Sequence, residues 1–257
     1  MSAFAPYRLM TEEEAPAARL GLVVLQTDEV LETDLRRLFE PDAIALHITR
    51  IPSGAEVTPE ALSAMEAALP AATALLPPGR YDAIGYGCTS GTVMIGAERV
   101  ATLIQGAAET GTVVTPLTAA ADALAALGAR RIGLLSPYIA SVSAPMEDAF
   151  AGLGIETVSR ISFGEETEAR VARIAPASIR AAAQALAQTP GVEALFLSCT
   201  NLAAHSVIDA LEAETGLPVV TSNLALAWAL ARAGDVALAP GAPGRLTREE
   251  GTTRRSA

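Results

Sequence analysis

The chain contains no lysine, because all 18 of its basic residues are arginines. Without a lysine side chain the protein cannot form a Schiff base, which excludes ordinary pyridoxal-phosphate catalysis by this chain. The same absence removes the lysine with which a P-loop binds nucleotide phosphates. We therefore expect chemistry that needs no cofactor.

Long apolar runs are also missing. No run reaches the roughly 20 residues that span a bilayer, so we expect no membrane partner. The N-terminus carries Glu12, Glu13 and Glu14 and lacks the basic start and apolar centre of a signal peptide. We expect a cytoplasmic protein, in whose reducing surroundings the two cysteines are free rather than bridged.

Aromatic residues make up only 4% of the chain against 51% hydrophobic residues, so small aliphatic side chains must fill the core. The formal charge of −11 argues against a nucleic-acid partner. Two scattered histidines and two distant cysteines make a poor zinc set, so no metal site is expected. His47 lies in an apolar strand and is expected to be structural. His205, about 240° around a helix from Cys199, is a poor partner for that thiol.

Apolar runs typical of strands alternate with alanine-rich helical segments, which predicts parallel sheets covered on both faces. The expected strands are Leu20–Leu25, Ile44–Thr49, Ala83–Tyr86, Val113–Thr115, Ile132–Leu135, Ile155–Ile161, Ala194–Leu197 and Val219–Thr221. Helices are expected at Pro59–Leu69, Thr118–Leu127, Ile179–Ala187, Leu202–Glu214 and Asn223–Ala233.

The pattern is also repeated. Three pairs of segments resemble each other in the same order: Arg19–Val23 and Arg131–Leu135, 112 residues apart; Gly87–Thr89 and Ser198–Thr200, 111 apart; and Thr110–Thr115 and Thr215–Thr221, about 105 apart. Any protein built of βα units shows some self-similarity, but a nearly constant offset indicates duplication. We therefore predict an α/β fold of two similar flavodoxin-like or Rossmann-like lobes, related by a pseudo-twofold, with the active-site cleft between them.

The repeat also predicts the domain boundaries. We expect an N-terminal extension at residues 1–18, a first lobe at 19–116 and a second lobe at 117–221. Residues 222–239 are expected to pack back on the first lobe. The Pro-, Gly-, Thr- and Arg-rich residues 240–257 are expected to form a tail outside the core.

Cys88 and Cys199 each follow an apolar strand and precede a threonine and a predicted helix. Ligands of open α/β sheets bind at this end of the strands. A helix N-terminus there should lower the pKa of each thiol. Its free N–H groups, the hydroxyls of Thr89, Ser90 and Thr200 and the amide of Asn201 could bind a substrate carboxylate. The pseudo-twofold would place one thiol on each side of a small ligand.

Two plainer interpretations stand beside this one. A lone buried cysteine is usually a small hydrophobic residue, although the matched placement of the only two cysteines favours a catalytic pair. Gly85, Gly87 and Gly91 form a G-x-G-x-x-x-G pattern near the dinucleotide fingerprint, but the spacing is wrong and a tight turn is the better interpretation. A nicotinamide-dependent oxidoreductase therefore remains a weaker alternative.

Four segments resemble the aspartate/glutamate racemase superfamily, in particular its branch of maleate cis-trans isomerases and arylmalonate decarboxylases. They are Cys88–Gly91, Ser136–Tyr138, Phe163–Ile179 with its Ala172–Pro176 stretch, and Ser198–Asn201. The resemblance covers about residues 19–234 and is closest to the ectoine-utilisation protein A group.

The resemblance implies roles for three residues without any cofactor. Cys88 would be the nucleophile or base, Cys199 the partner acid, and Tyr138 a ligand of a substrate carboxylate. Decarboxylases of the superfamily keep only the second cysteine, so Cys88 argues against decarboxylation. We expect a small carboxylate as substrate and a homodimer or higher homo-oligomer.

One position departs from the family pattern. Maleate isomerases carry an asparagine after the first strand, where this chain reads Gln26-Thr27-Asp28. Thr27 and Asp28 are expected to contact the substrate, and Asp28 would repel a carboxylate unless it is protonated or turned away. This speaks against maleate and favours a substrate with a cationic or neutral polar group nearby. The ectoine-utilisation resemblance would imply an intermediate of compatible-solute metabolism.

Several functions remain open at this point. A racemase or epimerase would move a proton from one face of the α-carbon to the other, whereas a cis-trans isomerase, including maleate isomerase proper, would add Cys88 to a double bond. Both need the same residues. A non-catalytic two-lobe ligand-binding protein is the alternative of a different class, and it would need no paired thiols.

Overall fold

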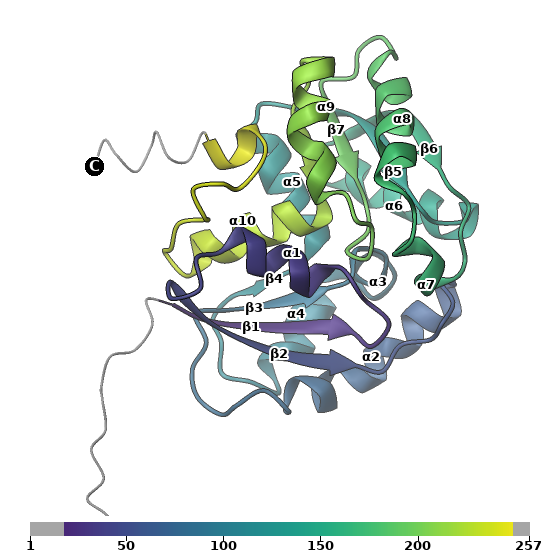
Figure 1. Ribbon diagram of the computed structural model, residues 1–257. Helices are drawn as coiled ribbons and strands as arrows, with labels where there is room; N and C mark the ends of the chain where they lie inside the picture. The colour runs from purple at the N-terminus through teal and green to yellow at the C-terminus, as the bar shows by residue number, and fades with distance from the viewer. Residues whose placement is uncertain (1–17, 249–257) are drawn as a thin grey trace, which may run out of the picture.

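The computed structural model describes residues 18–248, which form two α/β lobes (Figure 1). Each lobe is built on a four-stranded parallel sheet. The first sheet has the order β2-β1-β3-β4 and comprises β1 (Ala18–Leu25), β2 (Ile44–Ile51), β3 (Ala83–Gly87) and β4 (Val113–Val114). The second has the order β6-β5-β7-β8 and comprises β5 (Arg131–Ser136), β6 (Glu156–Ser162), β7 (Ala194–Leu197) and β8 (Val219–Thr221). The predicted two-lobe α/β fold is confirmed.

The two sheets also share their register. Leu20 pairs with Ala83 in the first sheet, and Ile132 pairs with Ala194 in the second. These pairs are related by the offsets of 112 and 111 residues that the sequence repeat shows. Counted from these pairs, Cys88 and Cys199 occupy equivalent positions after β3 and β7.

Helices cover both faces of each sheet. The first lobe contains α1 (Leu31–Leu38), α2 (Pro59–Thr73), α3 (Thr89–Ile95) and α4 (Ala97–Gln105). The second contains α5 (Pro116–Ala126), α6 (Ala140–Gly152), α7 (Glu168–Val171), α8 (Pro176–Ala187), the 3-10 turn η1 (His205–Val207) and α9 (Ile208–Thr215). The last long helix is α10 (Ser222–Ala233).

Local sequence explains where three of these helices begin. The hydroxyls of Thr58, Thr115 and Thr221 accept hydrogen bonds from the first turns of α2, α5 and α10, as N-cap residues do. Proline follows at the first helical position of α2 and α5, where its missing N–H costs nothing.

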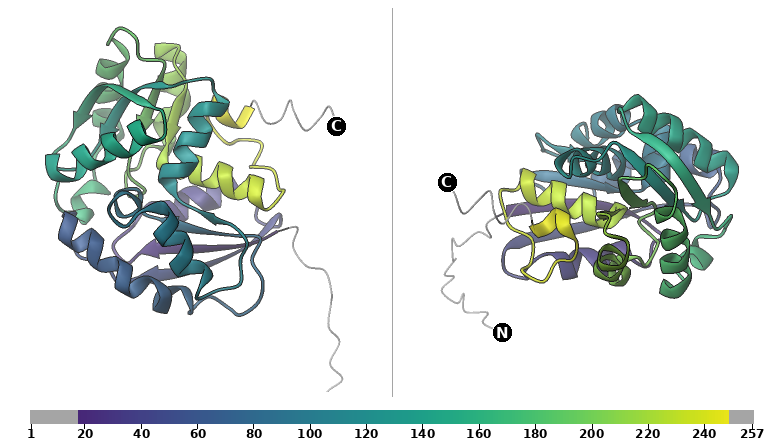
Figure 2. Two further views of the ribbon diagram at one scale, coloured as in Figure 1. Left: turned by 180° about the vertical axis from the view of Figure 1, so that it is seen from behind. Right: turned by 90° about the horizontal axis from the view of Figure 1, so that it is seen from above.

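Helix α10 lies where the two lobes meet. It packs against α1 and β3 of the first lobe and against α5 of the second, and the reverse view in Figure 2 shows α5 and α10 side by side between the sheets. Buried alanines on both helices, such as Ala120 and Ala227, let them approach closely. The boundary between the lobes is thus a packed apolar interface.

The structure differs from expectation after Cys199. A helix was expected from Leu202, but α9 begins only at Ile208, after the 3-10 turn η1. Cys199 itself has a φ of 121°, a strained value for a residue with a side chain, which turns the chain away from a helical path. The segment 200–204 is therefore a loop.

The C-terminal residues differ as well. Residues 240–248 were expected to lie outside the core, but Leu246 is buried and the backbone N–H of Arg245 donates to the Glu212 carboxylate of α9 at 3.0 Å. This short segment packs on the second lobe because Glu212 would otherwise be a buried carboxylate with fewer donors. Residues 1–17 and 249–257 lie outside the described residues. In the described part, no helix is long and apolar enough to span a bilayer.

Candidate active site

Cys88 lies at the end of β3 and is the N-cap residue of α3. Its sulfur accepts the N–H of Gly91 at 3.1 Å and lies 3.7 Å from the Ser90 hydroxyl. A Cβ at position 91 would lie 2.9 Å from this sulfur and 2.8 Å from the Tyr86 hydroxyl. Gly91 is therefore required for the close packing of the turn around the thiol.

Cys199 occupies the equivalent turn after β7 but in a different local structure. Its N–H donates to the Ser222 hydroxyl at 3.0 Å, and no helix starts at its side chain. The expected helix N-terminus is therefore absent at Cys199, and a helix dipole does not act on this thiol.

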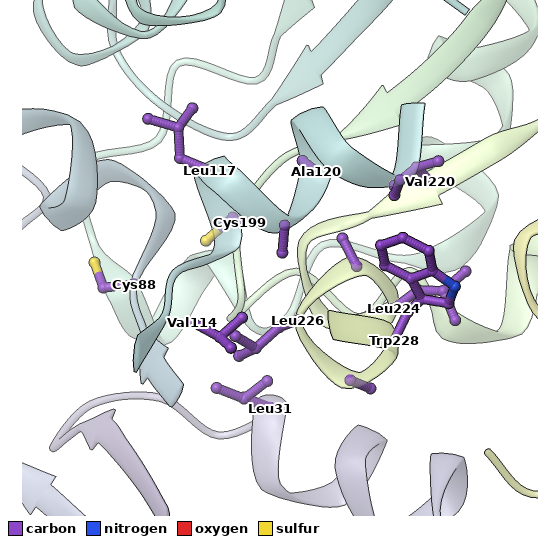
Figure 3. Packing of buried hydrophobic residues seen from close by; sticks show 14 of the residues in the cluster. Leu31, Cys88, Val114, Leu117, Ala120, Cys199, Val220, Leu224, Leu226 and Trp228 are labelled. Atoms are coloured by element: carbon purple, nitrogen blue, oxygen red, sulfur yellow. The ribbon is translucent and has the colours of Figure 1, made fainter. Parts of the chain in front are cut away.

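Hydrogen bonds across the lobe boundary tie the two cysteine turns together. Ser222, at the start of α10, accepts both the Cys199 N–H and the Thr89 hydroxyl, the latter at 2.8 Å. The Thr200 hydroxyl donates to the carbonyl of Gly87 at 3.2 Å. Each cysteine is thus followed by a threonine whose hydroxyl donates a hydrogen bond across the lobe boundary. Figure 3 shows the two side chains on neighbouring turns.

Both thiols are free and buried, at 3% exposure for Cys88 and 6% for Cys199. Burial raises the pKa of the Cys88 thiol to about 12, and the charge of Glu168 adds to this effect. Burial and the Glu168 charge likewise raise the pKa of Cys199 well above its usual value. The expectation that helix N-termini lower both pKa values is wrong, because loss of solvent outweighs the single N–H bond at Cys88.

Tyr138, which the resemblance implies as a ligand of the substrate carboxylate, lies beside Cys199. Its hydroxyl is buried without a partner at full hydrogen-bond geometry, and it lies close enough to the Cys199 sulfur to lower the pKa of that thiol. Tyr86 presents a second buried hydroxyl without a partner, next to Cys88. Unpaired buried hydroxyls are costly, so these two groups mark a place for a polar ligand.

Asp28 is also in this group. One carboxylate oxygen accepts the N–H groups of Val30 and Leu31, each at 2.8 Å, at the entrance to α1. The other oxygen is buried and has no partner at full hydrogen-bond geometry, although the nearby Thr200 hydroxyl lowers the pKa of this carboxyl. Burial raises the pKa of Asp28 more than these bonds lower it. Thr27, in contrast, is half-buried and its hydroxyl pairs with that of Ser53 at 3.0 Å.

The remaining predicted ligands are buried but largely engaged. The Thr89 and Thr200 hydroxyls join the lobes, and Ser90 lies against the Cys88 sulfur. The Asn201 amide donates to both the carbonyl and the carboxylate of Glu168, at 3.0 and 2.8 Å, and accepts the N–H of Glu29 at 2.9 Å. Asn201 thus links the lobes in this arrangement rather than offering a free donor.

Sequence reasoning missed two residues of the site. Ser222 follows β8, so the rule that ligands bind at the carboxyl ends of strands could have found it. Glu168 is the first residue of α7, and its buried carboxylate is close enough to raise the pKa of both thiols. It lies in the Phe163–Ile179 segment that carries the family resemblance, and this resemblance was the only sequence feature that pointed to Glu168.

A recess of about 210 Å³ adjoins this group at the lobe boundary. It is lined by Gln26, Thr27, Glu29 and Ala55 from the first lobe and by Thr167, Glu168 and Ala169 from the second. Among the described residues, no cluster of three or more His, Cys, Asp and Glu could hold a metal ion. The glycines of the weak dinucleotide pattern serve packing instead, since a Cβ at Gly87 would lie 2.5 Å from Leu31.

Comparisons with known proteins identify the family to which the chain belongs. A model of the arylmalonate decarboxylase family matches residues 55–247. Maleate isomerase from Nocardia farcinica is 29% identical, over 90% of this chain and 96% of its own, and that from Pseudomonas putida is 26% identical, over 87% and 95%. The crystal structure of a cysteine-to-alanine variant of Pseudomonas putida maleate isomerase with maleate superposes with a TM-score of 0.79 at 25% identity. It covers 90% of this chain and 97% of that one.

The matched segment spans about three quarters of the 257 residues. The fold, with its two parallel sheets, agrees with the family's solved structures. The protein is therefore a maleate isomerase-like enzyme of the arylmalonate decarboxylase family, within the aspartate/glutamate racemase superfamily.

Proposed function

We propose that the protein is a cofactor-independent isomerase of a small carboxylic acid, with Cys88 and Cys199 as its catalytic pair. The observation that carries the proposal is the matched placement of the two free thiols, on equivalent turns of two repeated lobes. A structural role does not require such symmetry, and neither does a non-catalytic ligand-binding protein.

Two chemical routes use the same pair. In racemisation, the Cys88 thiolate removes the proton α to the carboxylate and the Cys199 thiol delivers one to the opposite face. In cis-trans isomerisation, the Cys88 sulfur bonds to one alkene carbon while Cys199 protonates the other. After rotation about the resulting single bond, Cys199 takes the proton back and the carbon–sulfur bond breaks. The isomerisation route returns both cysteines to their starting state. Racemisation leaves Cys88 as the thiol and Cys199 as the thiolate, so proton exchange with water must restore the starting state before the next turnover in the same direction.

Neighbouring groups support these roles. The free Tyr138 hydroxyl beside Cys199 can donate to a substrate carboxylate. Because burial holds both thiols in the neutral form, the thiolate at Cys88 forms only when the substrate enters and changes these surroundings. The substrate therefore takes part in activating the nucleophile.

A more specific proposal concerns the identity of the carboxylic acid substrate. The resemblance to the ectoine-utilisation protein A group leads us to propose a carboxylic acid of compatible-solute breakdown. Maleate is the second candidate, because the similar proteins from Nocardia farcinica and Pseudomonas putida are maleate isomerases. The unpaired buried oxygen of Asp28 speaks against maleate, because a dianion would be repelled by this carboxylate.

Proton exchange tests the proposal directly. The purified protein is incubated in D₂O with maleate, amino acids and ectoine-derived acids, and products are followed by NMR and mass spectrometry. We expect deuterium at the α-carbon of at least one acid, or conversion of a cis alkene to trans, and loss of net conversion when either cysteine is replaced by serine. Net conversion by either serine variant that equals that of wild type would contradict the proposal.

A further inference from the structure

The carboxylate of Glu168 is placed to meet a ligand. The side chain lies at the start of α7, is only 5% exposed and borders the recess between the lobes. One of its oxygens accepts the Asn201 amide at 2.8 Å, while no described residue donates to the other. Backbone bonding holds the residue in place, because its N–H donates to the carbonyl of Ala55 at 3.0 Å.

Asp28 provides independent evidence that a ligand with a hydrogen-bond donor binds here. It is 3% exposed and one of its carboxylate oxygens has no hydrogen-bond donor, although the other has two. Buried carboxylate oxygens without donors are rare in folded proteins. The charges of Asp28 and Glu168 act on each other and on both thiols, so the four groups share one space.

The charged and titratable groups around the thiols are all acidic. Those that act on Cys88, Cys199 and their tyrosine neighbours are Asp28, Glu168, Tyr86 and Tyr138. The nearest arginines are already engaged. Arg50 donates to three backbone carbonyls of the β1–α1 loop and pairs with Glu32, while Arg173 pairs with Glu29. The charge of Arg50 still lowers the pKa of Asp28, but no arginine is among the charges that act on Glu168 or on the thiols. A dicarboxylate would therefore add two negative charges to a site whose charged groups are mainly acidic.

We propose that Glu168, together with Asp28, binds a cationic nitrogen of the substrate, so that the enzyme selects carboxylic acids that also carry an ammonium or amidinium group. This inference rests on the proposed function, in which Cys88 and Cys199 act on a carboxylic acid. The carboxylate end of the substrate meets the free hydroxyl of Tyr138, and the cationic end meets Glu168. The enzyme thereby distinguishes the two ends of the substrate, and the reacting carbon is held between the thiols.

A positive charge bound at Glu168 also favours formation of the Cys88 thiolate. The Glu168 carboxylate opposes ionisation of both thiols, and a bound cation cancels that effect. Binding of the correct substrate thus favours the Cys88 thiolate, whereas a dianion leaves the thiol protonated. Glu168 is in this sense a specificity-determining residue.

The test compares acids of matched length that differ in one end group: succinate with β-alanine, and glutarate with 4-aminobutyrate. Deuterium exchange at the carbon next to the carboxylate is measured in D₂O for wild type and Glu168→Gln, with maleate as a further dicarboxylate. We expect wild type to exchange the cationic acid of each pair at least 100-fold faster. Glu168→Gln should lose most of that preference and act better than wild type on the dicarboxylates.

A control and a binding measurement keep the test decisive. Glu166→Gln makes the same chemical change at an exposed side chain of the same segment, and it should keep the wild-type preference. In parallel, the melting temperature of each protein is measured with each acid. The cationic acids should stabilise wild type and Glu166→Gln but not Glu168→Gln.

The outcomes separate the two proposals. If wild type exchanges or binds the dicarboxylates better than their cationic partners, the inference on Glu168 is overturned while the two-thiol function stands. Tighter binding of dicarboxylates at lower pH would support the inference, because protonation of Glu168 and Asp28 removes the negative charges that repel them. If the cationic acids stabilise wild type but no acid is turned over, binding at Glu168 is supported and the two-thiol function fails.

Discussion

At the scale of single residues, the two thiols have unlike surroundings. Cys88 accepts the Gly91 N–H at 3.1 Å and lies near a serine hydroxyl, at the start of a helix. Cys199 lies on a strained turn without a helix, and the Asn201 N–H and the Tyr138 hydroxyl lower its pKa. This difference favours Cys88 as the thiol that becomes a thiolate and Cys199 as the thiol that delivers a proton.

Serine variants of the two cysteines should therefore fail in different ways. We expect both Cys88→Ser and Cys199→Ser to lose net conversion by at least 1000-fold, because serine has too high a pKa to replace a thiolate. Cys199→Ser should still exchange the proton on the face that Cys88 reaches, and Cys88→Ser should not. Exchange and net turnover are measured side by side, and full net turnover in either variant would end the two-thiol hypothesis.

Tyr138 offers a test that separates binding from stability. Its hydroxyl has no partner within the described protein, so Tyr138→Phe should leave the free energy of unfolding within about 1 kcal/mol of wild type. The same change should raise KM or lower kcat at least 10-fold, because it removes a donor to the substrate carboxylate.

Tyr81→Phe is the matched control. The Tyr81 hydroxyl donates to the carbonyl of Pro77 at 2.7 Å, away from the thiols. This variant should lose about 1 kcal/mol of stability and keep its kinetics. The opposite pattern, with a destabilised Tyr138→Phe of normal kinetics, would make Tyr138 a structural residue.

The raised pKa of Cys88 predicts how stability depends on pH. The thiol titrates at 9.0 when unperturbed and at about 12 in the folded protein. The folded state therefore holds its proton more tightly, and this contribution is complete below pH 9 and lost as the pH rises towards 12. Above pH 9 the thiol should lower the stability by about 1 kcal/mol per pH unit.

Urea unfolding of wild type and Cys88→Ser at pH 8, 9 and 10 measures this contribution. The variant should show the shallower decline, because its serine does not titrate in this range. Parallel curves for the two proteins would show that Cys88 is not held neutral by burial.

At the scale of elements, the start of α10 connects the two cysteine turns. Ser222 accepts from the Thr89 hydroxyl and from the Cys199 N–H, and its neighbour Asn223 donates to the Thr200 carbonyl and to Asp34 of α1. One helix N-terminus therefore orients both loops that carry the thiols. It does so because β8 ends at the boundary between the lobes.

Ser222→Ala should therefore affect both folding and activity. The change leaves two buried donors without an acceptor, which costs about 1–3 kcal/mol of stability. We expect turnover to fall as well, because the two thiols lose their common support. Ser206→Ala, at an exposed serine of η1, should change neither property, and a Ser222→Ala protein as stable and active as this control would refute the connecting role.

At the scale of the whole molecule, the proposed reaction uses only groups that the chain itself supplies. The chain has no lysine, and no His, Cys, Asp and Glu cluster suited to a metal lies within residues 18–248. We expect turnover to be unchanged after exhaustive treatment with EDTA followed by desalting. Loss of activity that an added divalent metal restores would contradict a cofactor-independent mechanism.

Local sequence patterns were enough to predict the repeat, the eight strands and the equivalent positions of the two cysteines. These features depend on local patterns, because a parallel strand reads as a continuous apolar run and duplication leaves a constant offset. The paired register of β1 with β3 and of β5 with β7 follows from the same offset. Recognition of Cys88 and Cys199 as a pair needed only their equivalent places in the repeat.

The tertiary structure alone decided the electrostatics of the site. Whether a thiol pKa falls or rises depends on solvent and charge around it, and Glu168 reaches the thiols from a segment 80 residues after Cys88. Ser222 bonds Thr89 across 133 residues of sequence, which no local pattern reveals. The helix expected after Cys199 is replaced by a loop because contacts between the lobes hold this residue at a positive φ. Local sequence thus places the thiols, and long-range packing determines the solvent exposure and the charges around them.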